Sequence, residues 1–413
     1  MTYPTYSSYR DSGVAWLGEV PSHWGVKRLK FMAKLQNGSD YKHIESHDGY
    51  PVIGSGGQFA YATDYLYNGE SVLLGRKGTI DKPLYVNGAF WTVDTMYYTE
   101  IFQNTCPKFL YYLTLTVDFW KYSTQTALPS MTQTSLNNLI FAAPEYEEQT
   151  AIADYLDTQT AQIDALIDKQ QNLLAKLAEQ RSSVITQAVT RGLNPNAPMK
   201  ESGVAWLGEV PSHWEIWKIT HAINLIGSGT TPKSDNAEYY DGEILWVTTS
   251  ELRESLISDT KQKISDSAIK DYSALKKYPK NSVAIAMYGA TIGRLGILEK
   301  EATFNQACCV FGNSDILHYK FLFYWLWQRR PALISLSNGG GQPNLSQDDL
   351  KKIKIPLPPL AEQTAIADYL DEQTAHIDCL SQKVEQAIGR LKEYRTALIT
   401  QAVTGKIKVI TEG

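Results

Sequence analysis

One stretch of 43 residues occurs twice in this chain. Residues 148–190 and 362–404 are identical at 26 of the 43 positions after a shift of 214. A second stretch, DSGVAWLGEVPSHW at 11–24, returns as ESGVAWLGEVPSHW at 201–214 after a shift of 190. A period of roughly 200 residues is too long for a solenoid repeat. The chain therefore consists of two tandem copies of one unit, each large enough to bury its own core.

The longer repeat predicts a long helix in each copy. Pro144 precedes it in copy one and Pro358–Pro359 in copy two, and proline suits a helix start. Apolar residues follow a heptad through both stretches, which indicates a coiled-coil seam. Gln159 and Gln373 fall at matching seam positions, where polar residues can fix the register. The predicted helix-pairing residues are Leu156, Ile163, Leu166, Leu173 and Leu177 in copy one, and Leu370, Ile377, Leu380, Val384 and Leu391 in copy two.

A coiled coil of these two helices packed against each other is their simplest arrangement. Both stretches are acidic, so lone helices would associate weakly, and packing the two against each other resolves this. Helices of roughly 40 residues at about 1.5 Å per residue would be near 60 Å long. The pair is predicted to be a rigid spacer between two modules.

The shorter repeat, which we call the tag, contains two tryptophans around a Pro-Ser turn. Trp16 and Trp24 in copy one correspond to Trp206 and Trp214 in copy two. We expect these side chains to pack against the repeated helices or a partner. Plain core packing is an equally good interpretation.

The segments between the repeats differ between the copies. Residues 25–146 and 215–360 contain short runs of Tyr, Val and Thr punctuated by glycine, which predicts short strands and tight turns. Residues 109–123, FLYYLTLTVDFWKYS, have room for one apolar helix, and FLFYWLWQRR stands at the corresponding place in copy two. Between these matching stretches the two segments are largely unrelated in sequence. This is expected for two domains that recognise different targets but share one scaffold.

Composition is that of a globular protein, with 43% hydrophobic and 20% charged residues. No stretch approaches 18 uncharged apolar residues and the N-terminus has no apolar core behind a basic start, so we expect no membrane span, no export and a cytoplasmic location. Neither the cysteines nor the histidines have ligand spacing, so no metal site is expected. The cysteines are predicted to be buried free thiols: Cys106, Cys308, Cys309 and Cys379.

Charge is distributed unevenly along the chain. The net charge of −5 argues superficially against nucleic acid. Residues 145–180 contribute −6 and residues 361–393 contribute −4, so the rest of the chain carries +5. Acidic residues therefore concentrate on the repeated helices, while the variable segments carry basic clusters, although any one cluster could be ordinary solvated surface.

Several motifs occur in the order that one known family shows. They are GSGTTPKSDNAEYYDGEILWVTTSEL at 227–252, MYGATIGRLGIL at 287–298, NQACCVF at 305–311 and GGGQPNLSQDDLKKIKIPLPPLAEQTAIADYLD at 339–371. With the duplicated layout, the chain closely resembles the specificity subunit of type I restriction–modification systems over nearly its whole length. Copy one departs from the pattern, with LQNGSDYKHIESHDGYPVIGSGGQF in place of the GTTPK region.

The resemblance implies an α+β, pseudo-twofold symmetric fold. Two tandem α/β target-recognition domains would be separated by two long helices packed as an antiparallel coiled coil. The implied segments are a first recognition domain with its tag at 1–146, a first spacer helix and linker at 147–200, a second recognition domain at 201–360, and a second spacer helix with a C-terminal tail at 361–413.

The resemblance also implies a non-catalytic role in phage defence. Each recognition domain would bind one half of an asymmetric bipartite site in double-stranded DNA, and the helices would set the gap. The chain would recruit two modification subunits, which methylate adenine with S-adenosylmethionine, and through them two restriction subunits that use ATP and Mg²⁺. No cofactor is expected on this chain itself.

The residues agree with a role that involves no catalysis. No NPPY-type tetrapeptide is present to hold a flipped adenine. GSGTTPKS at 227–234 approaches the phosphate-loop pattern, but Pro232 replaces the last glycine and removes a backbone N–H that such a loop uses. The same loop can offer donors to DNA phosphates and base edges, or be a plain surface turn.

The candidate DNA contacts are polar residues in or beside these glycine-containing loops. Arginine is the commonest bidentate reader of guanine, and asparagine or glutamine can pair bidentately with adenine. A structural turn or a solvated side chain is the alternative at each position. The candidates are Arg76, Lys77, Gln133 and Thr134 in copy one, and Ser228, Thr230, Thr231, Lys233, Tyr288, Arg294, Gln342 and Asn344 in copy two.

Two other classes of function stay open at this point. A self-contained methyltransferase or nuclease would require a catalytic motif that the sequence does not present. A coiled-coil adaptor without DNA function would leave the basic, divergent segments unexplained.

Overall fold

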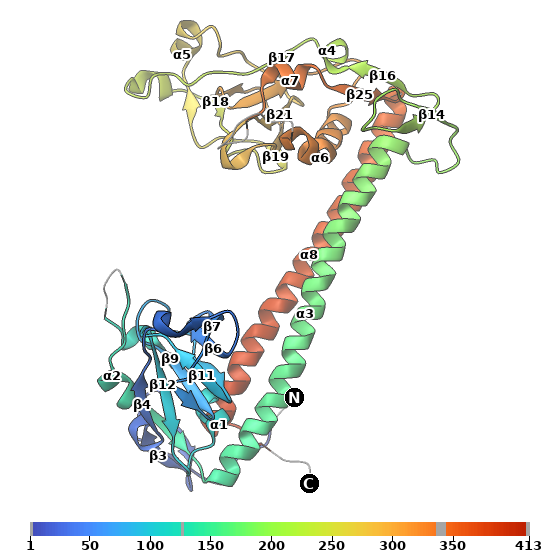
Figure 1. Cartoon of the computed structure of the whole chain (residues 1–413). Coiled ribbons are helices and arrows are strands. Elements are labelled where there is room, and N and C mark those ends of the chain that lie inside the picture. Colours follow the sequence, from blue (N-terminus) through green and yellow to red (C-terminus); the bar gives the residue numbers. More distant parts are fainter. Residues whose placement is uncertain (1–2, 125–127, 336–343, 410–413) are drawn as a thin grey trace. The chain divides into compact units, whose positions relative to one another are not determined.

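The computed structural model describes residues 3–124, 128–335 and 344–409 and divides into two compact units (Figure 1). The first unit comprises residues 1–172 and 385–413, and the second comprises residues 173–384. Each unit contains one tag, one strand-rich module, the start of one long helix and the end of the other. Helices and sheets are both present, which confirms the α+β class. The division into four sequence segments stays a prediction.

The module of the first unit contains two main sheets beside helix α1 (Pro107–Thr114). One sheet is antiparallel, and in the other β6 (Tyr50–Gly54) and β11 (Ala89–Thr92) pair in parallel. Phe109, Leu110 and Leu113 of α1 are fully buried, and the helix packs on β9 and β10. The first sheet has the order β10 (Leu84–Val86), β9 (Ser71–Gly75), β12 (Met96–Ile101), β4 (Ala33–Asn37), and the second has the order β5 (Glu45–Ser46), β7 (Gly57–Ala62), β6 (Tyr50–Gly54), β11 (Ala89–Thr92), β8 (Tyr67–Asn68).

The module of the second unit repeats this plan with different strands. Helix α6 (Tyr319–Ser335) packs on β21 and β22, and Phe321 and Trp325 are buried in its core. The strands β18 and β23 pair in parallel, as β6 and β11 do. One sheet has the order β17 (Ile226–Gly227), β24 (Cys308–Phe311), β21 (Val283–Ala286), β22 (Leu295–Leu298), β19 (Ser255–Ile257), and the other has the order β20 (Lys263–Ile264), β18 (Ile244–Val247), β23 (Thr303–Phe304).

Short elements connect each module to its tag and long helix. The tags are hairpins, and the strand after each tag pairs with a strand at the far end of the module sequence, directly before the long helix. In the first unit these are β1 (Tyr9–Asp11) with β2 (Glu19–Pro21), and β3 (Gly25–Arg28) with β13 (Ile140–Ala143). In the second unit they are β14 (Met199–Glu201) with β15 (Glu209–Pro211), and β16 (Glu215–Lys218) with β25 (Lys354–Leu357). The remaining short helices are α2 (Gln133–Asn137), α4 (Ile219–Ala222), α5 (Asp266–Asp271) and α7 (Gln347–Lys351).

The long helices are α3 (Tyr146–Arg191) and α8 (Leu360–Val403), and their segments are antiparallel within each unit. In the second unit Arg181 Nε donates to Asp378 at 3.3 Å, while Gly192 lies beside Glu362. In the first unit Arg395 Nε donates to Asp164 at 2.9 Å. Because these two ion pairs join equivalent positions of the repeat, the two units repeat one contact.

The buried stripe of each long helix differs in phase from the prediction. On α3 it runs through positions 156, 160, 163, 167, 170, 174, 177, 181, 184 and 188. Leu156, Ile163 and Leu177 lie on it, but Leu166 and Leu173 are 46% and 41% exposed, so their prediction as seam residues is wrong. On α8, Leu370, Ile377 and Val384 are buried, while Leu380 and Leu391 are half-buried.

Polar residues explain why the buried stripe runs through other positions than predicted. Thr160 and Thr374, rather than Gln159 and Gln373, occupy the inward positions, and each is 5% exposed. Their hydroxyls donate to helix carbonyls one turn earlier, at 2.7 Å, which satisfies them within the apolar stripe. Counting apolar residues alone therefore selected the neighbouring positions.

The inner tryptophan of each tag joins two helix ends. Trp24 is 1% exposed, and its Nε1–H donates to Glu148 at 3.1 Å near the start of α3. The same indole packs against Gly405, two residues after the end of α8. Trp214 repeats this arrangement in the second unit, where it donates to Glu362 of α8 at 3.1 Å and lies beside Gly192, after α3. The tag therefore packs against both helices of its unit.

Replacement of Trp24 tests this junction. We expect Trp24→Ala to lower the free energy of unfolding by about 3–5 kcal/mol, because it opens a cavity at a fully buried site. Trp24→Phe keeps most of the ring but leaves Glu148 without its indole donor, which costs about 1–3 kcal/mol. Urea unfolding of the purified chain measures both values. Trp120→Ala is the control, since Trp120 is 56% exposed; a Trp24→Ala chain as stable as this control would contradict the assignment.

Among the described residues, no helix combines the length and the apolar character needed to cross a membrane.

Candidate nucleic-acid interface

In copy two, the GTTPK loop lies on the turn that follows β23. Gly229 N–H donates to the Asn305 carbonyl at 3.3 Å, and Thr231 Oγ1 donates to Gln306 Oε1 at 2.7 Å. A Cβ on Gly229 would lie 1.6 Å from the Phe304 carbonyl oxygen, so only glycine permits this approach. The loop backbone is therefore fixed against the sheet.

Other predicted residues of this loop are held by their backbones. The Thr230 carbonyl accepts from Trp246 Nε1 at 3.1 Å, and the Ser228 carbonyl accepts from Tyr278 Oη at 3.3 Å. Lys233 N–H donates to Tyr272 Oη at 3.1 Å, while the Lys233 side chain is exposed. The Lys233 side chain is therefore exposed on a fixed backbone, while the Thr231 hydroxyl already donates to Gln306.

The YGATIG loop, taken as residues 288–294 so that it includes Arg294, begins beside the same turn. Met287 N–H donates to the Ala307 carbonyl at 2.8 Å, directly after Gln306. Tyr288 forms an antiparallel bridge with Asn344, and Leu345 N–H donates to the Met287 carbonyl at 2.7 Å. The GTTPK loop, the turn after β23, the YGATIG loop and Asn344 thus lie together. Gln342 lies outside the described residues.

Arg294 ends the YGATIG loop with its side chain exposed. The backbone N–H of Arg294 donates to the Thr291 carbonyl at 3.0 Å, and the Arg294 carbonyl accepts from the Ala286 N–H at 2.9 Å. Across the part of the chain that the structure describes, neither Arg294 nor Lys233 belongs to a salt bridge. Two cations thus accompany the hydroxyl and amide groups of the converging loops, a combination suited to phosphates and base edges.

Copy one brings its four predicted residues to an equivalent place. The Arg76 and Lys77 N–H groups both donate to the Thr95 carbonyl, and Arg76 Nη1 donates to the Asp94 carbonyl at 3.2 Å. Met131 N–H donates to the Arg76 carbonyl at 2.9 Å, which places Gln133 and Thr134 beside this loop.

A glycine again fixes the scaffold in copy one. A Cβ on Gly38 would lie 2.0 Å from the Val93 carbonyl oxygen, which excludes a side chain there as the 1.6 Å approach does at Gly229 in copy two. Ser39 N–H donates to the Thr92 carbonyl at 2.9 Å, which ties the same turn to the end of β11. The two sites share a backbone plan but present different side chains.

Sequence reasoning missed three polar neighbours of the predicted residues. Asn37 Oδ1 accepts from Gln133 Nε2 at 3.2 Å, and Gln306 accepts from Thr231. Asn305 supplies a carbonyl to the Gly229 turn. The NQ pair of NQACCVF was the available signal for two of them, since paired polar residues precede an otherwise buried strand.

Three of the four cysteines are buried and one is exposed. Burial raises the pKa of the Cys309 thiol to about 12 and raises that of Cys308 as well, so both stay protonated in the core. Cys106 is also buried. Cys379 is exposed, so its prediction as a buried thiol is wrong; it lies on α8 outside the buried stripe. Among the described residues, no group of three or more His, Cys, Asp or Glu could hold a metal ion.

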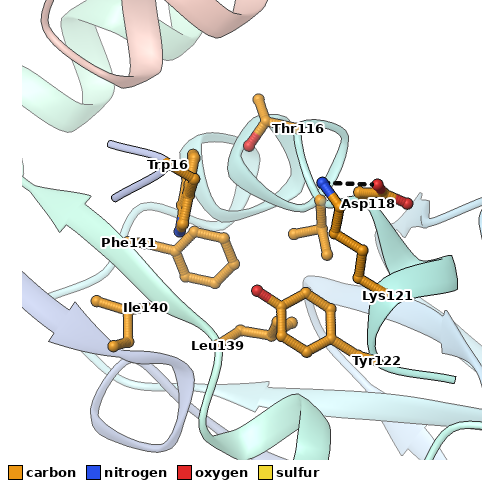
Figure 2. A pocket seen from close by; sticks show the side chains of 9 residues that line it. Trp16, Thr116, Asp118, Lys121, Tyr122, Leu139, Ile140 and Phe141 are labelled. Carbon is orange, nitrogen blue, oxygen red and sulfur yellow. Dashed lines mark ion pairs between the residues drawn. The ribbon is translucent and has the colours of Figure 1, made fainter. Parts of the chain in front are cut away.

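Each copy also has a pocket beside its outer tag tryptophan. Figure 2 shows the first, a cavity of about 170 Å³ in which Trp16 lies beside Phe141 and the Asp118–Lys121 ion pair lies at the edge. The second pocket, of about 590 Å³, is lined by Trp206, Arg329 and Leu333. The Arg329 guanidinium lies 3.5 Å from the centre of the Trp206 ring. Trp16 and Trp206 are 43% and 41% exposed, in contrast to the buried inner tryptophans.

The close approach of Gly229 to the Phe304 carbonyl leads to a prediction. We expect Gly229→Ala to cost about 3 kcal/mol or more, because the new methyl group would overlap a backbone carbonyl that cannot move independently. Gly56→Ala is the matched control, since a Cβ there meets nothing within 4 Å. Urea unfolding measures both free energies. Equal stability of the two variants would show that the turn tolerates a side chain and that the close approach is wrong.

Comparison with known proteins identifies matches over both copies. The family model for the type I restriction modification DNA specificity domain matches residues 21–176 and 211–389. The EcoBI specificity subunit of Escherichia coli is 22% identical over 428 residues, covering 96% of this chain and 89% of its own length. The MjaVIII specificity subunit of Methanocaldococcus jannaschii is 27% identical over 327 residues, covering 72% of this chain and 69% of its own length.

Solved structures share the fold. A chain from a type I R-M system, solved to explain its complex assembly and conformational transition, has a TM-score of 0.73 at 16% identity and covers 93% of this chain and 98% of its own. The HsdS subunit from Thermoanaerobacter tengcongensis has a TM-score of 0.55 at 17% identity, with 94% and 98% covered.

Proposed function

This chain belongs to the family of type I restriction modification DNA specificity domains, as a specificity subunit of a type I restriction–modification system, and we propose that it directs adenine methylation to an asymmetric, bipartite DNA sequence. In this proposal the chain performs no chemistry itself. Each strand-rich module reads one half of the site, and α3 and α8 set the length of the unspecified gap.

The observation that carries this proposal is the repeated scaffold with changed side chains. Gly38 and Gly229 make the same close approach in the two copies. The groups presented there differ: Arg76 and Lys77 occupy the loop in copy one, whereas Tyr288 and Arg294 occupy it in copy two. Base-edge contacts specify sequence while the backbone scaffold positions them, so two such sites are suited to two different short sequences.

Catalysis belongs to partner subunits in this proposal. Two modification subunits would bind S-adenosylmethionine and methylate adenine, and two restriction subunits would use ATP and Mg²⁺. The two tag pockets support recruitment of one partner in two copies, because near-identical tags place a half-exposed tryptophan at both. DNA contacts of an asymmetric site differ between the copies, so a surface kept the same in both is better suited to a repeated protein partner.

A genome-wide map of methylated adenine tests DNA specificity. Cells would express this chain with its neighbouring modification subunit, and control cells would lack this chain. We expect a split motif, with two short defined blocks around a fixed gap, and exchange of residues 25–146 should change only one block. Absence of methylation, with the modification subunit active beside another specificity subunit, would contradict the proposal and favour a coiled-coil adaptor.

Replacement of the outer tryptophans tests partner recruitment. We expect the Trp16→Ala/Trp206→Ala chain to bind the modification subunit at least about tenfold more weakly at each site, since a tryptophan in an interface pocket is a typical hot spot. Analytical ultracentrifugation of the mixed subunits without DNA measures affinity and stoichiometry. Phe59→Ala serves as the control, because Phe59 is 56% exposed and lines neither pocket. Unchanged assembly of the double variant would exclude the tag pockets as the docking sites.

A further inference from the structure

A half-buried ion pair contacts the end of the YGATIG loop of copy two. Arg330 Nη2 of α6 lies 2.5 Å from Glu254 Oε1, and the two side chains are only 25% and 28% exposed. Glu254 directly precedes β19, and Arg330 lies near the end of α6. The pair therefore joins the helix to the sheet at the place where β22 begins.

The Glu254 carboxylate also contacts the backbone that ends the loop. Leu295 N–H donates to Glu254 Oε1 at 3.4 Å, and Glu254 N–H donates to the Leu295 carbonyl at 2.9 Å. Glu254 has a φ of 60°, which side-chain-bearing residues rarely adopt and which surrounding contacts must maintain. Leu295 directly follows Arg294, so this contact fixes the residue next to the exposed arginine.

The aliphatic part of the Arg330 side chain packs against the loop at Gly293. A Cβ on Gly293 would lie 2.7 Å from Arg330 Cγ, so Gly293 rests directly on this side chain. Gly293 has a φ of 76°, and its N–H donates to the Ala286 carbonyl at 2.8 Å. Arg294 is thus held between Gly293, which rests on Arg330, and Leu295, which contacts Glu254.

We propose that Glu254 and Arg330 are positioning residues that hold the YGATIG loop, and with it Arg294, in the geometry that reads the copy-two half of the DNA target. This rests on the proposed function. Both side chains are about three-quarters buried, so removal of one partner leaves the other charge only partly compensated by solvent. The loop then loses the contact that fixes its end.

Copy one offers a built-in comparison. The residue that corresponds to Arg330 is Asp118, by alignment of FLYYLTLTVD with FLFYWLWQRR. Asp118 is 51% exposed and pairs with Lys121 three residues later, at 3.1 Å, instead of reaching the recognition loop. The Glu254–Arg330 pair is therefore a feature of copy two, and its removal should affect only one half of the target.

The experiment uses the full chain with its modification subunit and scores methylation at the split motif and at sites that differ from it by one base. Arg330→Ala, Arg330→Lys and Glu254→Gln are the test variants. Lys263→Ala is the control: it breaks a more exposed ion pair of the same unit, Lys263–Glu243 at 3.2 Å. We expect discrimination against single-base changes in the copy-two block to fall about tenfold in Arg330→Ala and Glu254→Gln, the scale of one bidentate base contact.

Arg330→Lys should recover part of this discrimination, because it keeps the charge and most of the stem under Gly293. In the test variants, discrimination against single-base changes in the copy-one block should equal that of the unaltered chain. The Lys263→Ala chain should show unaltered discrimination in both blocks. If the Arg330→Ala chain does not fold, the two near-isosteric variants decide the outcome. Unchanged discrimination in those variants, or equal loss in both blocks, overturns this inference. Absence of a split motif for the unaltered chain would instead overturn the proposed function.

Discussion

The hydrogen bond between an inner tag tryptophan and a helix glutamate is the contact on which each unit depends. Trp24 donates to Glu148 and Trp214 to Glu362, near the starts of α3 and α8, while each indole also packs on the glycine that follows the end of the other long helix. One side chain thus connects two helix ends that are far apart in sequence. Because the indole is buried, its donor must be satisfied, and the charged carboxylate makes the bond stronger than a neutral one.

Much of this fold follows from the sequence because its strongest signals are local. The repeated stretches predicted α3 and α8, and glycine-punctuated runs predicted short strands. The phase of the buried stripe did not follow, since Thr160 and Thr374 lie inward with their hydroxyls bonded to the helix backbone. Arg181 and Arg395 also occupy the stripe, where their stems pack and their charges reach Asp378 and Asp164. Hydrophobic periodicity cannot identify polar residues that are satisfied by such contacts.

The sequence predicted which loops form the candidate sites, but not which distant residues contact those loops. The glycine-containing motifs located the GTTPK and YGATIG loops, and the structure brings them to one turn. Gln306, Asn37 and the Glu254–Arg330 pair were not predicted, because each contact joins residues far apart in sequence. Gln306 lies 75 residues from Thr231, and Asn37 lies 96 residues from Gln133. Glu254 and Arg330 lie in different parts of the module. Only the pairing of strands places such residues together, and the sequence does not specify that pairing residue by residue.

The close approaches at Gly38 and Gly229 also bear on how new specificities could evolve. Both positions exclude a side chain for reasons internal to the module, so the loop backbone stays constant while its exposed side chains can be exchanged. A mutation at Thr231 or Arg294 changes what is offered to a ligand without requiring the core to be repacked. Under the proposed function, diversification of such a chain proceeds by single substitutions in either copy, with one half of the target preserved while the other half changes.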